Sequence, residues 1–377
     1  MSLRYTAAWL QDGAFNPLVA PPPPTLLYNL YSWGANNFGQ LGIGNLTYYS
    51  SPKQVGSLTN WLAITSGGYA NGVVKTDGTL WTWGRGQLGI LGLGNITDYS
   101  SPKQVGALTN WQGVSMSSNH CVAVKTDGTL WAWGFGGVGQ LGQGNTNQYS
   151  SPKQVGALTN WAIAKALSNN TIAIKTDGTL WSWGQNSSGI LGLGNTSYYS
   201  SPKQVGSLTN WRNLAHTPQA SFCLALKTDG TIWSWGQNGQ GQLGLGNTTS
   251  YSSPKQVGAL TNWSSVGQAR FSSFAITTTG QLYSWGANGA GQLGLGNITY
   301  YSSPKQIGAA TNWSKVNCGT AHSMSIKTDG TIWSWGDNRN GQLGLGNTTN
   351  RSSPVQIGAL AQWLNVSAGV YHTMALG

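Results

Sequence analysis

Residues 227–254 read KTDGTIWSWGQNGQGQLGLGNTTSYSSP, and close variants of this stretch recur along the chain. Seven Ser-Ser-Pro triplets and seven Trp-Gly pairs advance together in steps of 50 residues, with one step of 52. The pairs begin at Trp33, Trp83, Trp133, Trp183, Trp235, Trp285 and Trp335. A regular period near 50 is typical of propellers and solenoids, whose units bury their apolar faces against one another.

One period, from Pro52 to Ser101, predicts four short strands. Asp77-Gly78 is a strong hairpin signal, because glycine accepts the positive φ of a tight turn. The aromatic, alternating run after it is typical of a strand, and the Gly-rich residues 84–94 predict an ordered loop. The predicted strands cover residues 53–55, 62–65, 72–75 and 79–83. Four strands in each of seven periods predict an all-β propeller with seven four-stranded blades.

The two ends of the repeat region test whether the ring is closed. Gly377 falls one period after Lys327, at the point where another KTDG turn would follow, so the last repeat lacks its final strand. Residues 29–33 align with 79–83 and supply such a strand before any partner exists. An open solenoid needs polar caps instead. We therefore expect residues 28–377 to form one propeller, closed by pairing the N- and C-terminal strands in one blade.

Composition excludes several other classes of protein. Only 7% of the 377 residues are charged, against about 25% in ordinary domains, and there is no Glu, which excludes coiled coils and helical bundles. No apolar run reaches the 18 or more residues of a membrane helix, so no membrane insertion is expected. The net charge of +11 is spread over the repeats with no basic run, which argues against specific nucleic-acid binding. Six lysines recur after Ser-Ser-Pro, where they discourage edge-to-edge pairing: Lys53, Lys103, Lys153, Lys203, Lys255 and Lys305.

Candidate chemical groups are few, and each has a structural explanation. Three histidines share one repeat position, which allows a metal ring, but four repeats have other residues there, which favours a scaffold role. The three cysteines form no CxxC pair and are expected to be buried free thiols. These residues are His120, His322 and His372, and Cys121, Cys223 and Cys318. The sequence thus predicts no catalytic residue, no cofactor and no metal, and a non-enzymatic protein.

Tryptophan and the variable loops divide scaffold from candidate surface. Almost all of the twenty Trp residues occupy three recurring positions, which predicts packing between neighbouring blades. The repeats differ in the turn before the third strand of the period, after Trp-Gly, and before Ser-Ser-Pro. Tyr, Arg and Asn on such loops are favoured at contact surfaces, although drift at solvated turns explains them equally well. The rim contact candidates, with either rim open, are Tyr48, Tyr49, Arg85, Phe135, Arg270, Phe271, Arg339 and Arg351.

Residues 1–27 stand outside the repeats and combine apolar and aromatic residues with a run of four prolines, Pro21 to Pro24. Such a run makes a stiff spacer of about 3.1 Å per residue. We interpret the segment as an anchor that docks the propeller to another protein, the alternative being that it folds back over one face. The anchor candidates are Tyr5, Trp9, Leu10, Phe15, Asn16, Pro17 and Leu18.

The stretch from Trp233 to Asn247, followed by S-S-P-x-Q-V/I, resembles the repeat of the regulator of chromosome condensation family, as does Val366 to Thr373. The resemblance recurs seven times over residues 28–377. It implies a seven-bladed propeller that acts as an interaction platform, and its nuclear members resemble exchange factors for a small GTPase. The near-identity of the repeats is also similar to propeller proteins of tailed bacteriophages.

The leading hypothesis from the sequence is a non-enzymatic virion component of a tailed phage, on the capsid, neck or tail. Its partners would be other virion proteins, through the N-terminal segment, and a host surface glycan or protein. A low share of charged residues and a closed ring suit exposure outside a cell. The alternative is a cytoplasmic protein-interaction platform or GTPase regulator of the chromosome condensation regulator family.

Overall fold

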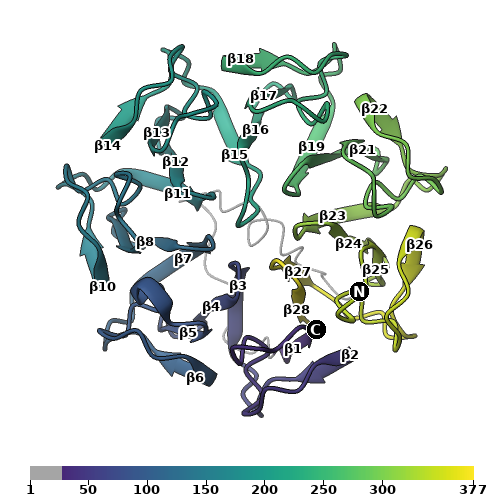
Figure 1. Cartoon of the computed structure of the whole chain (residues 1–377), viewed down its shortest axis with the longest axis horizontal. Coiled ribbons are helices and arrows are strands. Elements are labelled where there is room, and N and C mark those ends of the chain that lie inside the picture. Colours follow the sequence, from purple (N-terminus) through teal and green to yellow (C-terminus); the bar gives the residue numbers. More distant parts are fainter. Residues whose placement is uncertain (1–27) are drawn as a thin grey trace, which may run out of the picture.

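The computed structural model describes residues 28–377, which form seven antiparallel sheets arranged around a central axis (Figure 1). Each sheet has four strands, so the predicted seven-bladed β-propeller is confirmed. In six blades the chain runs from the innermost strand to the outermost strand before it enters the next blade. Among residues 28–377, no helix is long and apolar enough to cross a membrane.

The strands fall into four concentric sets. The innermost are β3 (Trp61–Ser66), β7 (Trp111–Met116), β11 (Trp161–Ala166), β15 (Trp211–Leu214), β19 (Trp263–Gln268), β23 (Trp313–Cys318) and β27 (Asn365–Ala368). The second are β4 (Ala70–Lys75), β8 (His120–Lys125), β12 (Asn170–Lys175), β16 (Phe222–Lys227), β20 (Ser272–Thr277), β24 (His322–Lys327) and β28 (His372–Leu376).

The two outer sets carry the Trp-Gly and Ser-Ser-Pro signatures. The third strands are β1 (Leu30–Gly34), β5 (Leu80–Gly84), β9 (Leu130–Gly134), β13 (Leu180–Gly184), β17 (Ile232–Gly236), β21 (Leu282–Gly286) and β25 (Ile332–Gly336). The outermost are β2 (Tyr49–Gln54), β6 (Tyr99–Gln104), β10 (Tyr149–Gln154), β14 (Tyr199–Gln204), β18 (Tyr251–Gln256), β22 (Tyr301–Gln306) and β26 (Arg351–Gln356). A short 3₁₀ helix covers Gln87–Gly89.

One blade, which we call the closing blade, is built from both ends of the propeller in the order β2-β1-β28-β27. β1 pairs with β28 in antiparallel register from Leu30 opposite Leu376 to Gly34 opposite His372. Beyond the strands, the amide of Asn29 donates to the carbonyl of Gly377 at 2.9 Å, and the reverse bond is 3.1 Å. The predicted closure is confirmed.

The antiparallel strands divide the connections between two faces of the ring. The "turn face" carries the hairpins between second and third strands, such as Thr76–Thr79, and the linkers between blades, such as 105–110. The "loop face" carries the turns between first and second strands, such as 67–69, and the long loops between third and outermost strands, such as 85–98.

The core lies between neighbouring blades, and the tryptophan of each Trp-Gly pair sits in it with no exposed surface. The indole of Trp83 donates to the carbonyl of Gln40 in the preceding blade at 3.0 Å. Gly42 lies against the same ring, because a Cβ there would be 2.6 Å from the indole nitrogen. The predicted packing role of these tryptophans is confirmed.

The outermost strand is longer than predicted. Residues 53–55 were the expected strand, with Pro52 at its start, whereas β2 begins at Tyr49 and contains the proline. The register is irregular between Ser32–Lys53 and Gly34–Tyr49, so ladder pairing is interrupted around Pro52. An edge strand tolerates this, because a missing N–H there costs no partner.

Candidate functional site

All eight rim contact candidates lie on one face of the propeller. Arg85, Phe135 and Arg339 follow third strands, Arg270 and Phe271 join β19 to β20, and Tyr48, Tyr49 and Arg351 lie where outermost strands begin. Each of these points belongs to the loop face. The sequence did not decide between the two rims of the propeller. The strand order places all eight candidates on the loop face.

Within that face, Phe38, Tyr69, Arg85 and Tyr371 form what we call the aromatic–arginine cluster. The rings of Phe38 and Tyr69 meet edge to face with centroids 5.3 Å apart, and Tyr69 lies 6.3 Å from Tyr371. The Arg85 guanidinium lies over Phe38 at 5.0 Å and over Tyr69 at 5.8 Å. All four side chains are half-buried. Burial raises the pKa of the Tyr69 hydroxyl, which therefore stays protonated.

The cluster exists because the ring closes. Phe38 follows β1 and Tyr371 precedes β28, so both belong to the closing blade, while the other two members come from the next blade. Of the four, sequence reasoning named only Arg85 as a contact candidate. The available signal was the pairing of the chain's two ends, which brings residues 38 and 371 to one junction.

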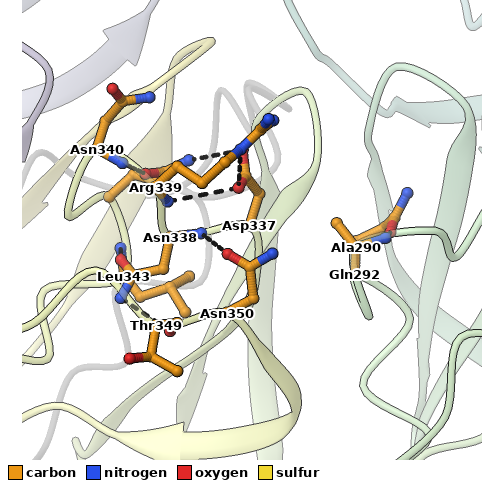
Figure 2. Close-up of polar contacts among 10 residues, drawn as sticks. Ala290, Gln292, Asp337, Asn338, Arg339, Asn340, Leu343, Thr349 and Asn350 are labelled. Carbon is orange, nitrogen blue, oxygen red and sulfur yellow. Dashed lines mark hydrogen bonds and ion pairs between the residues drawn. The ribbon is translucent and has the colours of Figure 1, made fainter.

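Buried amides hold the surrounding loops in place. In the loop after β25, the side-chain amide of Asn338 donates to the carbonyl of Thr349 at 3.1 Å, and its oxygen accepts the amide of Leu343 at 2.9 Å. Beside it, the exposed Arg339 pairs with the buried Asp337 at 2.8 Å (Figure 2). The loop face is thus a set of ordered loops, on which side chains are presented at fixed positions.

The other rim candidates are not all gathered into this cluster. The guanidinium of Arg270 lies 4.8 Å from the ring of Phe271 in the blade of β19 to β22, so these two form a separate pair. The hydroxyl of Tyr48, a side chain 43% exposed, bonds to Asn37 beside the cluster. The structure places these residues but does not test their role in contact.

The three histidines that share a repeat position connect neighbouring blades, as the scaffold interpretation expected. His120 bonds through Nε2 to the hydroxyl of Thr171 at 2.9 Å. That hydroxyl donates to the carbonyl of Gln140, so Nε2 of the histidine is the donor in their hydrogen bond. His372 bonds to Asn71 in the same way. Burial lowers the pKa of both histidines to about 3 and that of His322 to about 4.

The cysteines do not pair, and the histidines do not form a metal site within residues 28–377. Cys121, Cys223 and Cys318 are buried free thiols, and burial raises the pKa of each. Within the part of the chain that the structure describes, no three His, Cys or acidic side chains are grouped as metal ligands would be.

The two-residue insertion near His216 forms an unexpected feature, the axial loop, residues 215–221. This loop extends from β15 toward the centre of the ring (Figure 1). Nε2 of His216 lies 3.1 Å from the carbonyl of Met116 and 3.0 Å from that of Ala166, in two other blades. On the opposite side, Gln219 accepts a bond from Thr320 at 3.1 Å. The sequence showed the irregularity but gave no sign of its direction.

The N-terminal anchor candidates, Tyr5 to Leu18, lie outside the described residues, so the structure places none of them.

Comparison with known proteins gives matches to a repeat family and to solved propellers. The regulator of chromosome condensation (RCC1) repeat matches residues 29–74, 77–124, 127–170, 177–216, 229–276, 279–326 and 329–376. A second description of the same repeat matches 111–140 and 313–342. No curated protein sequence matches significantly.

Two solved structures illustrate the likeness in fold. Human WBSCR16 is 18% identical with a TM-score of 0.83, over 93% of this chain and 98% of that one. Prp20p from Saccharomyces cerevisiae is 20% identical with a TM-score of 0.81, over 97% and 96% of the two chains. Since repeat matches cover nearly all of residues 29–376, the chain belongs to the regulator of chromosome condensation repeat family.

Proposed function

We propose that this propeller is a non-enzymatic protein-binding platform whose loop face engages a partner through the aromatic–arginine cluster. The observation that carries the proposal is the cluster itself, in which three aromatic rings and one guanidinium contact one another at the junction of two blades. Tyr and Arg are enriched among the few residues that supply most of the binding energy in protein interfaces.

The order of the face supports binding. Side chains already held by neighbouring rings lose little conformational freedom when a partner arrives, and this freedom is a main cost of association. The Arg85 guanidinium lies over the rings of Phe38 and Tyr69. The Tyr69 ring in turn contacts Phe38 and Tyr371. The partner is therefore expected to meet a preformed surface.

Family membership supports a platform better than a virion appendage. The structure of Prp20p is described together with its binding to Gsp1p and histones, and a further structure holds Kap60 bound to yeast RCC1 (Prp20). Those partners are partners of those proteins. Because the two propellers are only 18–20% identical to this chain, the likeness shows a shared fold and no shared partner. Regulation of a small GTPase is one form that a platform role takes, and nucleotide release across a panel of GTPases measures it directly.

The virion interpretation has no support from these comparisons. Docking of the propeller through residues 1–27 remains a prediction. Deleting residues 1–25 tests it, since the shortened protein should then fail to assemble with its partner while the propeller keeps its melting temperature.

A photo-crosslinking amino acid locates the binding face. Placed at Phe38 on the loop face, it should capture a partner from cells of the source organism, whereas at Leu158, an exposed side chain in a turn-face linker, it should not. The captured protein, once purified, should bind the Y69A/Y371A variant at least 30-fold more weakly than the wild type, about 2 kcal/mol. The matched control is L108S/L158S on the turn face. Crosslinks only from the turn face, or equal affinities, would refute the proposal.

A further inference from the structure

The arginines of the propeller gather on the loop face, whereas its aspartates gather on the turn face. Four of the five arginines in residues 28–377 lie on loop-face segments: Arg85, Arg270, Arg339 and Arg351. Five of the seven aspartates in the same range lie exposed in KTDG hairpins of the turn face: Asp77, Asp127, Asp177, Asp229 and Asp329. This division favours an acidic group of a partner on the loop face, beside its arginines.

The two aspartates of the loop face are engaged within their own loops. Asp337 is buried and pairs with Arg339 at 2.8 Å. Asp98 accepts the backbone amide of Gly86 at 2.7 Å. Within residues 28–377, Arg85 forms no ion pair with these or any other acidic residues. The guanidinium of the aromatic–arginine cluster is therefore open to the carboxylate of another protein.

The Arg85 guanidinium keeps most of its hydrogen-bond donors for such a group. Its central carbon lies 5.0 Å from the ring centre of Phe38 and 5.8 Å from that of Tyr69. One terminal nitrogen donates to the side-chain oxygen of Gln87, a neutral acceptor in the same loop. A guanidinium has five N–H donors in a planar fork, and two of them match the two oxygens of a carboxylate.

Two tyrosine hydroxyls of the cluster add further donors. The rings of Tyr69 and Tyr371 lie 6.3 Å apart, and neither hydroxyl bonds to another residue of the described chain. Burial raises the pKa of the Tyr69 hydroxyl, and the nearby charge of Arg85 opposes that rise. This hydroxyl is thus close to the guanidinium and protonated at neutral pH, so both groups can donate to one carboxylate.

A small recess lies beside Arg85. Its lining includes Tyr69, Arg85, Gln87, Leu88 and Ser118, and its volume is about 10 Å³, the space that one group of the size of water occupies. Leu88 has φ +64° and is the one non-glycine residue of the described chain with a positive φ. Backbone strain of this kind is concentrated at ligand-binding positions. The recess can receive a small polar group and is too small for an apolar side chain.

We propose that the aromatic–arginine cluster selects an acidic protein segment, in which one Asp or Glu carboxylate pairs with Arg85 and an apolar neighbour packs on the exposed parts of the rings. This inference rests on the proposed function and names the chemistry of the partner. Nucleic acid fits less well, because contacts to successive phosphates need several basic side chains in a row, whereas the cluster holds one.

A display library of random peptides about 12 residues long, selected on the full chain, is the probe. Peptides that bind the wild type but not Y69A/Y371A are those that use the cluster. We expect Asp and Glu in these peptides at least 3-fold above their frequency in the library. A purified member should bind R85Q at least about 10-fold more weakly, as expected for the loss of a charged hydrogen-bonded pair. R85Q preserves folding, since Gln185 and Gln237 occupy the equivalent position in other blades.

The matched control is R212Q, the same change in an exposed arginine of β15, where another blade carries Gln112. It should leave peptide binding unchanged. Raising the salt concentration should weaken binding to the wild type more than binding to R85Q, because salt screens the ion pair.

The outcomes separate this inference from the proposed function. Cluster-dependent peptides without enrichment of Asp and Glu, or with equal affinity for R85Q, would overturn the inference and leave the platform in place. A library with no cluster-dependent peptide would overturn both. A short oligothymidylate is the probe for phosphate, and if it bound as tightly as the peptides and with the same loss in R85Q, the cluster would belong to a nucleic-acid site and the inference would be wrong.

Discussion

The turn face and the loop face of the same ring are built in different ways. On the turn face, Asp127 accepts the amide of Thr129 at 2.9 Å and its hydroxyl at 2.7 Å, and the equivalent bonds recur in other KTDG turns. The preceding Lys125 is buried, 3.8 Å from the ring of Trp131 and 4.8 Å from that of Trp111. On the loop face, the residue that directly follows Trp-Gly differs between repeats and is Arg, Phe, Gln, Ala or Asp. In the KTDG turns, sequence identity among the repeats therefore goes with shared packing and shared hydrogen bonds.

This comparison also explains part of the basic composition. The KTDG lysines look like surface charges in the sequence, yet Lys75, Lys125, Lys175 and Lys227 are buried against indole rings, and burial lowers their pKa values. These cations belong to the scaffold. The lysines after Ser-Ser-Pro lie on outermost strands, as the sequence predicted.

The largest expected difference between the two faces is in their response to acid, which should destabilise the loop face more than the turn face. His120, His322 and His372 begin second strands at the loop face, and His216 lies in the axial loop. Their folded pKa values of about 3 to 4 lie below the usual 6.5, so the unfolded chain binds more protons in between and stability falls as pH drops through this window. At about 1.4 kcal/mol per pKa unit, each of these histidines lowers the free energy of unfolding by about 3 kcal/mol at pH 4. Urea unfolding from pH 7 to pH 4 should show a steep loss.

The turn face supplies the internal control for acid. The pKa values of Asp127 and Asp177 are held below 3.8 mainly by bonds from the neighbouring threonines, so their contribution is lost only as pH falls through those lower values. The H372Q variant should reduce the pH dependence by up to one proton. Constant stability from pH 6.5 to pH 4 would contradict the assignment.

Glycine substitutions should give the next largest difference. An alanine at Gly128, φ +75° in a turn-face hairpin, would collide with the carbonyl of Thr159, and we expect a loss of at least about 2 kcal/mol. Gly106, φ +59° with open space around it, isolates the backbone term at about 1 kcal/mol. Gly239 on the loop face has open space and should cost below about 1 kcal/mol. Equal losses in urea unfolding for Gly128→Ala and Gly239→Ala would show that the clash at Gly128 adds nothing to the cost of a Cβ.

A smaller effect is expected for the buried lysine. Lys125→Thr copies Thr277, which another blade carries at the equivalent position, and should lose about 1 kcal/mol of cation–π stabilisation. Lys103→Thr, on an outermost strand with its ammonium 5.5 Å from the Tyr99 ring, should lose less. Thermal unfolding of the two variants gives the comparison, and a greater loss for Lys103→Thr would show that the buried ammonium stabilises nothing.

The smallest effect is expected at the loop-face surface. Arg270→Ala should change the free energy of unfolding by less than about 0.5 kcal/mol, since its side chain is exposed and lies over a single ring. A larger loss in urea unfolding would mean that this rim position is scaffold, and that its variation among repeats reflects packing.

Blade number and the core tryptophans could be predicted because their signals recur in seven repeats. Repetition averages out local ambiguity, and the alignment of residues 29–33 with the missing last strand fixed the closing blade. Features that occur once were not accessible in this way. The axial loop is a two-residue difference in length, and the contacts of His216 with two other blades occur at a position that no other histidine shares.

The candidate site was predictable only in part. Arg85 was identified because its loop varies, but variation does not say which loops meet. The contact between Phe38 and Tyr69 needs the ring geometry, and so does the choice of face. From a periodic sequence the repeated scaffold can thus be predicted well, whereas contacts that occur at only one junction cannot.

The pairing of β1 with β28 has a consequence for synthesis. β1 leaves the ribosome early, and its permanent neighbour is among the last segments of the described chain to emerge. Until then β1 has an open edge, of the kind that invites pairing with other chains. Synthesis of β28 therefore completes the ring, and a nascent chain released before β28 would carry an unpaired β1 into the cell.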